Sequence, residues 1–463
     1  MNRGKYPPSR AATMPKSKIL RRIYTILIAF ILLLIVTGWI FYKFYLDDAL
    51  NHYLKPQLVT AFEKATDGKY KLQFGTISYV PGSIRVDSLS VIRIGYDSSE
   101  HGWVVSSARS GTIEIHGINL WDALWGNSMK MRSLEIFSPR IHFAELDSER
   151  MNLKLLRLSS TSETKDTSNL AQAISFDSVV FRNGDIEIPG GAENHPVIGK
   201  IAIKLTDFLI DPKDHTPHLP LFSKNVDFSI TSINYPMEGG EYGVEVRGLR
   251  GNAADSILHI DSFAYRPQYS KEKFPTLHKY VQPRLEFQCS GIDLNALHFN
   301  ELLSGGRLRA RSCTARSWSF DFYSDRRFPN NPHPPVAVLP NDIVRSIKFP
   351  IDLDSIVVDH GTMYWAEKWP AMRPGTLIFT DARIALFPFI TDSLNPNFQA
   401  PTAITVSALF QDEARLRGLA SYALHDKEVN FEINATVGGL TATKLNTELI
   451  PVERLEVTDG AST

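Results

Sequence analysis

The chain contains very little cysteine and no excess of charge. Two cysteines among 463 residues exclude a small scaffold held together by disulfides. Fifty Lys and Arg residues balance fifty Asp and Glu residues, so the basic surplus typical of a nucleic-acid-binding protein is missing. Hydrophobic residues make up 43% and charged residues 22%, which excludes both global disorder and a polytopic membrane protein.

The sequence also lacks the motifs of the common catalytic and metal centres. It contains no HExxH, CxxC, GxSxG or Walker pattern, and no GxGxxG pattern after a strand-like segment. The 13 histidines are scattered without the spacing of metal ligands. We therefore expect a protein that is not an enzyme and that holds no metal or other cofactor.

One long apolar run is present near the N-terminus. Residues 23–42 carry no charge and match, at about 1.5 Å per residue, a hydrocarbon core of about 30 Å. A cleaved signal peptide is the alternative, but its apolar region would be shorter and would end in small rather than aromatic residues. Residues 1–22 hold seven basic residues and no acidic one. This predicts a basic cytoplasmic tail, one transmembrane helix, and residues 43–463 across the membrane.

Beyond the apolar run, the pattern changes from helical to strand-like. Residues 43–68 place apolar side chains three and four apart, which predicts an amphipathic helix kinked at Pro56. From residue 69 onward, apolar and polar residues alternate with a period of two, and long helical patterns are scarce. Because parallel strands would require intervening helices, these patterns predict a mostly β protein with a long antiparallel sheet.

Three blocks of the β region recur in the same order, at offsets of 174 or 177 residues. They are 116–124 with 290–297, 176–184 with 353–361, and 205–207 with 379–381. Internal repetition of strands favours a surface built by extension over a compact enzyme.

We therefore predict two repeats, 69–265 and 266–463. Polar stretches at 159–168 and 328–340 interrupt the alternation and are expected to be surface loops.

Several segments carry a family resemblance. They are the apolar run with the amphipathic helix after it, Asp67–Leu72, Pro81–Val86, Gly117–Leu120, Met131–Ile141 and Thr443–Pro451. In these the chain resembles the AsmA-like family of membrane-anchored periplasmic proteins of bacteria with two membranes. The resemblance implies a curved β-groove with an apolar concave face, related to bridge-like lipid-transfer proteins, and a role in outer-membrane lipid homeostasis. It also implies a single-pass inner-membrane protein with acyl chains in its groove, an envelope protein partner at its distal end, and no catalytic residue.

Elementary packing physics leads part of the way to the same expectation. A sheet with one apolar face must cover it, and few helices are available, so a second sheet, a partner protein or lipid remains. Alternation places one set of side chains on that face. The predicted lipid-groove face comprises Ile201, Ile203, Leu205, Phe228, Ile230, Leu285 and Phe287. The alternative is the dry core of a closed β-sandwich in a non-catalytic structural or assembly scaffold.

The two cysteines lie in strand-like sequence. Cys289 is in step with Leu285 and Phe287. If residues 307–322 form the neighbouring strand, the sulfur of Cys313 could meet that of Cys289 and form a disulfide in an oxidising compartment. Two buried free thiols are the alternative, because unpaired cysteine is often buried.

Overall fold

The computed structural model describes most of the chain from residue 28 onward. The described residues are 28–38, 45–94 except 67 and 81, 103–118, 128–145, 173–188, 197–210, 222–302 except 238, 306–333, 342, 344, 346–347, 349–425 except 371, and 431–461.

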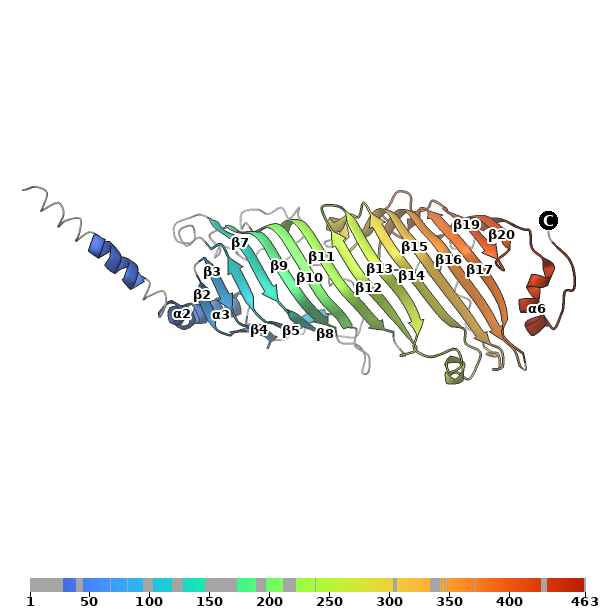
Figure 1. Ribbon diagram of the computed structural model, residues 1–463, viewed down its shortest axis with the longest axis horizontal. Coiled ribbons are helices and arrows are strands. Elements are labelled where there is room, and N and C mark those ends of the chain that lie inside the picture. Colours follow the sequence, from blue (N-terminus) through green and yellow to red (C-terminus); the bar gives the residue numbers. More distant parts are fainter. Residues whose placement is uncertain are drawn as a thin grey trace, which may run out of the picture.

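The described chain is dominated by one sheet of 21 strands, a long curved band that does not close on itself (Figure 1). This confirms the prediction of a mostly β protein with a long curved sheet. The strands are β1 (Tyr70–Phe74), β2 (Ile77–Val80), β3 (Ser83–Val86), β4 (Leu89–Arg93), β5 (Trp103–Ser110), β6 (Ile113–His116), β7 (Ser128–Phe137), β8 (Arg140–Glu145), β9 (Ala173–Glu187), β10 (Val197–Ile210), β11 (Ser223–Pro236), β12 (Tyr242–Asn252), β13 (Ile257–Pro267), β14 (Arg284–Asn295), β15 (Leu308–Asp325), β16 (Ile351–Lys368), β17 (Gly375–Phe387), β18 (Phe389–Ile390), β19 (Thr402–Phe410), β20 (Ala414–Tyr422) and β21 (Phe431–Gly438).

Strands follow one another across the sheet in nearly the order of the sequence. The first eight strands are short and form two series of pairings. In one series β1 pairs with β4, β4 with β5, and β5 with β8. In the other β2 pairs with β3, β3 with β6, and β6 with β7. From β9 to β21 each strand then pairs with the next, except that the short β18 extends the pairing with β16 and β19 pairs with β17. The sheet therefore grows by addition along one direction, as the colours of Figure 1 show.

The sheet contains parallel pairings at two places, and here the prediction of an antiparallel sheet is wrong. β9 runs parallel to β7 and β8, and β16 runs parallel to β15. A parallel pair needs a crossover of about a dozen residues or more, and residues 146–172 and 326–350 provide that length. The predicted surface loop 159–168, and residues 334–340 of the other predicted loop, lie outside the described residues.

Backbone irregularities recur at the spacing of the sequence repeat. Three pairs of residues, 174 or 177 apart, adopt positive φ on both members: Gly117 (74°) and Gly291 (59°), Asn183 (54°) and His360 (46°), and Asp207 (52°) and Asp381 (45°). Both parallel pairings also lie at matching points of the repeat. The sheet itself runs on through β13, so the division at residue 265 stays a prediction.

Few helices accompany the sheet. They include α2 (Leu46–Ala49), the π-helical segment η1 (Leu50–Leu54), α3 (Lys55–Ala65), the 3₁₀ segments η4 (Phe274–Leu277) and η6 (Ala442–Leu445), and α6 (Asn446–Glu453). Residues 46–65, within the expected amphipathic helix, are thus helical. The π-helical turn ends just before Pro56, whose ring would clash with an α-helical carbonyl four residues earlier.

Of the predicted span 23–42, the structure describes residues 28–38, which are helical with exposed apolar side chains. Residues 23–27 and 39–42 of the span lie outside the described residues, and so does the basic tail 1–22. Among the described residues, no helix is both long and apolar enough to cross a membrane. The transmembrane helix therefore stays a prediction.

Candidate lipid groove

Apolar side chains form rows that cross the sheet in register. Ile203 on β10 lies opposite Phe181 on β9 and Phe228 on β11. Followed from strand to strand in both directions, this row contains only apolar residues and glycine. Its members are Ile77, Val86, Ile113, Ile136, Phe181, Ile203, Phe228, Gly251, Leu258, Leu294, Cys313, Ile356, Leu386, Ile404, Ala420 and Ile433.

Two further rows run beside it. One begins at Ile201 and contains Ile201, Ile230, Leu249, Ile260, Ile292, Ala315, Val358, Ile384, Val406, Gly418 and Ala435. The other contains Leu72, Val91, Ala108, Ile141, Ile186, Ile198, Ile233, Val246, Phe263, Cys289, Trp318, Gly361 and Ala382. Neighbouring strands lie about 4.8 Å apart, so the longest row extends over roughly 70 Å.

A shift in side-chain phase keeps these rows on one face of the sheet. On β12 the exposed residues Arg247 and Arg250 are three apart instead of two, and so are Thr231 and Asn234 on β11. Gly248 lies within the β12 shift with a φ of 63°, a conformation that side-chain-bearing residues rarely adopt. The apolar residues before and after this shift in each strand therefore point to the same face of the sheet.

The structure brings five of the seven predicted groove residues together. Ile201 lies opposite Ile230, and Ile203 opposite Phe228, on the paired strands β10 and β11. Leu205 follows at the next level, where it packs in a cluster with Val179 and Val226. These residues form one patch of the apolar face.

The other two predicted residues lie farther along the sheet, on β14. Phe287 pairs with Tyr265 on β13 and with Phe320 on β15, and Leu285 pairs with Phe322. They belong to an aromatic part of the apolar face that the sequence analysis did not anticipate. Its members are Tyr265, Phe287, Phe320, Phe322, Trp365, Phe379 and Phe410. The alternation in residues 317–322 was its visible signal, but the partners come from strands far away in sequence.

Exposure varies within the patch of the apolar face around Ile203. Ile203, Phe228 and Ile230 are half-buried, whereas Ile201 is 8% and Leu205 5% exposed. In a closed sandwich the inner residues of both sheets would be sequestered from water. All described strands belong to a single open sheet instead, so the closed β-sandwich considered as an alternative is contradicted.

The opposite face of the sheet is polar and carries cross-strand ion pairs. Arg182 approaches Glu135 at 3.1 Å, and Lys200 approaches Asp185 at 3.3 Å. The basic side chains are 51% and 60% exposed and remain accessible to water, so each pair contributes little stability. The ion pairs distinguish this polar face from the face that carries the apolar rows.

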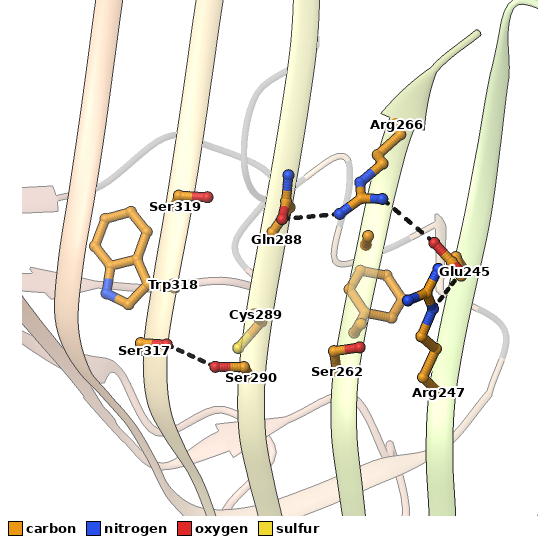
Figure 2. A pocket seen from close by; sticks show the side chains of 12 residues that line it. Glu245, Arg247, Ser262, Arg266, Gln288, Cys289, Ser290, Ser317, Trp318 and Ser319 are labelled. Atoms are coloured by element: carbon orange, nitrogen blue, oxygen red, sulfur yellow. Dashed lines mark hydrogen bonds and ion pairs between the residues drawn. The ribbon is translucent and has the colours of Figure 1, made fainter. Parts of the chain in front are cut away.

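Two hollows are lined by polar side chains of this face together with residues of the apolar rows, including Phe263 in one and Ile203 in the other. The one in Figure 2 has a volume of about 210 Å³. There the Arg266 guanidinium donates to Gln288 at 2.9 Å and pairs with Glu245 at 3.4 Å, while Ser290 and Ser317 share a hydrogen bond of 2.6 Å. A second hollow of about 810 Å³ lies over β9 to β13. Within the described part of the chain, no group of His, Cys, Asp and Glu side chains is placed to hold a metal ion.

The cysteines lie on the neighbouring strands β14 and β15, as the disulfide hypothesis required, but they are not opposite each other in the register of the two strands. Cys289 lies opposite Trp318, and Cys313 lies opposite Leu294. Both are free thiols in the structure, and of the two buried free thiols expected as the alternative to a disulfide, Cys289 is buried and Cys313 is half-buried. Burial raises the pKa of Cys289, and burial, reinforced by Cys289 and Asp293, raises the pKa of Cys313 to about 11. Both thiols are therefore protonated at neutral pH.

Comparison with protein-family models and with curated proteins finds no match for this chain. The resemblance to the AsmA-like family therefore stays a prediction.

Proposed function

We propose that this protein binds the acyl chains of lipids along the apolar face of its sheet and holds or conducts them for maintenance of the outer membrane. The supporting observation is the set of apolar rows in register across the sheet, the longest of which runs from Ile77 on β2 to Ile433 on β21. A row of this kind offers a continuous apolar path across the strands, whereas a core built only for stability needs no such continuity.

The energetics favour an apolar occupant. Ile203, Phe228 and Ile230 remain half-buried in the folded chain, so they still present apolar surface to solvent. Covering such surface gains about 25 cal/mol per Å², and each methylene that leaves water gains about 0.8 kcal/mol. An acyl chain that lies along a row collects this gain over many methylenes without any polar group to satisfy.

We further propose a single-pass protein of the bacterial inner membrane, with a cytoplasmic N-terminus and a periplasmic sheet. In the helical residues 28–38 large apolar side chains are exposed, with Leu33 at 60% and Ile35 at 61%. Exposed aliphatic side chains around a helix are suited to a lipid environment. An anchor of this kind places the first strands of the groove near the membrane that supplies the lipid.

The test is lipid analysis of the full-length protein purified in detergent. We expect mass spectrometry to find phospholipid or another acyl lipid retained in a fixed ratio to protein, in excess over an unrelated membrane protein with one anchor. A preparation that carries no more lipid than this control would contradict the proposal.

A further inference from the structure

The first edge of the sheet is sealed by side chains of the preceding helical segment. Asn51 donates to the carbonyl of Ile77 at 2.7 Å and accepts from its amide at 2.9 Å. Asp47 accepts from the amide of Tyr79 at 2.7 Å, and Lys55 donates to the carbonyl of Gly75 before β2 at 3.1 Å. The three capping residues follow one another at intervals of four, which places them on one side of the helical segment. The backbone of β2 is therefore protected against further pairing.

The last edge has no such protection among the described residues. β21 pairs with β20 alone, and every residue from 431 to 437 is exposed. Its apolar side chains reach 57% exposure at Phe431, 61% at Ile433 and 45% at Val437. The strand contains no lysine and no proline, the residues that usually guard an edge. An edge of this composition is suited to pairing with another strand.

Two of the three apolar rows also end at this edge. Ile433 is the last member of one row and Ala435 the last member of another. An added strand with the same alternation would continue both rows and cover the exposed side chains. Strand addition of this kind supplies main-chain hydrogen bonds for affinity and alternate side chains for specificity.

A second copy of the chain does not fit the edge when the protein is anchored as proposed. Parallel pairing of two identical edges would join the apolar face of one sheet to the polar face of the other. Antiparallel pairing would keep the faces together, but it would place the two N-terminal segments at opposite ends of the assembly. Two chains that extend away from anchors in one membrane cannot adopt either arrangement.

We infer that β21 is a docking edge for a strand of a different polypeptide, an inference that rests on the proposed anchoring. The strand must carry apolar residues in phase with Phe431, Ile433 and Val437. Glu432 is the one charged residue of β21, so charge complementarity calls for a basic residue opposite it. The partner is therefore a protein with an unpaired, alternating strand that carries a basic residue on its polar side.

The test places a photo-crosslinking amino acid at Glu432 of the full-length protein in the cells that produce it. The same group at Val80, which is 58% exposed on the sealed strand β2, serves as the control position. The edge is then altered by Ile433→Lys, which introduces a charge on the apolar side, and by Asn434→Lys, which introduces it on the polar side. If Ile433→Lys lowers the melting temperature, Ala435→Asp serves as a second substitution that introduces a charge on the apolar side of β21.

We expect an adduct with a different polypeptide from Glu432 and none from Val80. Ile433→Lys should reduce this adduct at least tenfold, and Asn434→Lys should change it less than threefold. The inference is overturned by the absence of an adduct, by an adduct of two copies of the chain, or by one that the apolar-side substitutions leave unchanged. Lipid content, measured on the same preparations, tests the groove separately, because the altered edge is far from Ile203.

Discussion

The substitution Ile203→Asp tests most directly whether the apolar face is open. Ile203 is half-buried between Phe181 and Phe228. Complete burial of an isoleucine side chain is worth about 1.5–3 kcal/mol, so a half-buried one loses about 1 kcal/mol on removal. Since the new carboxylate keeps part of its water, we expect a total cost of about 1–2 kcal/mol, and a fall of a few degrees in melting temperature.

Two control variants on β10 place the same charge at a buried and at an exposed position. Leu205→Asp places the carboxylate where the side chain is 5% exposed. There an unpaired buried charge costs several kcal/mol and the lost packing about 2–5 kcal/mol more, against a typical total stability of about 5–15 kcal/mol. We expect this variant to unfold. Ala202→Asp places the same charge at an exposed position of the polar face and should change neither stability nor lipid content.

The assay measures melting temperature and retained lipid on the same full-length preparations. Bound lipid at 100 times its dissociation constant would itself stabilise the protein by about 2.7 kcal/mol, so melting is compared after lipid has been removed. Ile203→Asp should lose most of its lipid and keep a nearly normal melt. If it unfolds as Leu205→Asp does, or retains lipid at the wild-type level, the reasoning for an open apolar groove is refuted.

Three further predictions concern other parts of the sheet. Gly361→Val should lower the melting temperature by at least several degrees, because a Cβ there would lie 2.0 Å from the Trp318 ring; a valine variant with a wild-type melt would contradict the close packing. Asn51→Leu removes both hydrogen bonds to Ile77 and should increase amide exchange at β2 while leaving β20 unchanged, and equal exchange in both strands would argue against local capping. Burial and the charges of neighbouring glutamates raise the pKa of Glu448 above 4.5, so attachment of α6 should weaken as pH rises from 4.5 through the raised pKa. Proteolysis at α6 should follow this pH dependence and lose it in Glu448→Gln; an unchanged profile would count against the burial of that carboxyl.

Much of the architecture follows from local patterns in the sequence. Alternation with a period of two specifies which residues of a strand share a face, because successive side chains of an extended chain point in opposite directions. It was therefore sufficient to place Ile201, Ile203 and Leu205 together and to predict a long sheet. The repeat also marked positions where the backbone later showed the same conformation, at Gly117 and Gly291.

Only the tertiary structure decided which strands pair, in which direction and at which level. Alternation has the same appearance in a parallel and an antiparallel strand, so the crossovers that make β9 and β16 parallel could not be recognised. For the same reason the sequence could not predict the register of β14 against β15, which separates two thiols that the sequence allowed to meet. Register is determined by main-chain hydrogen bonds and contacts between segments distant in the chain. These contacts join separate apolar faces into continuous rows, and no single strand contains that information.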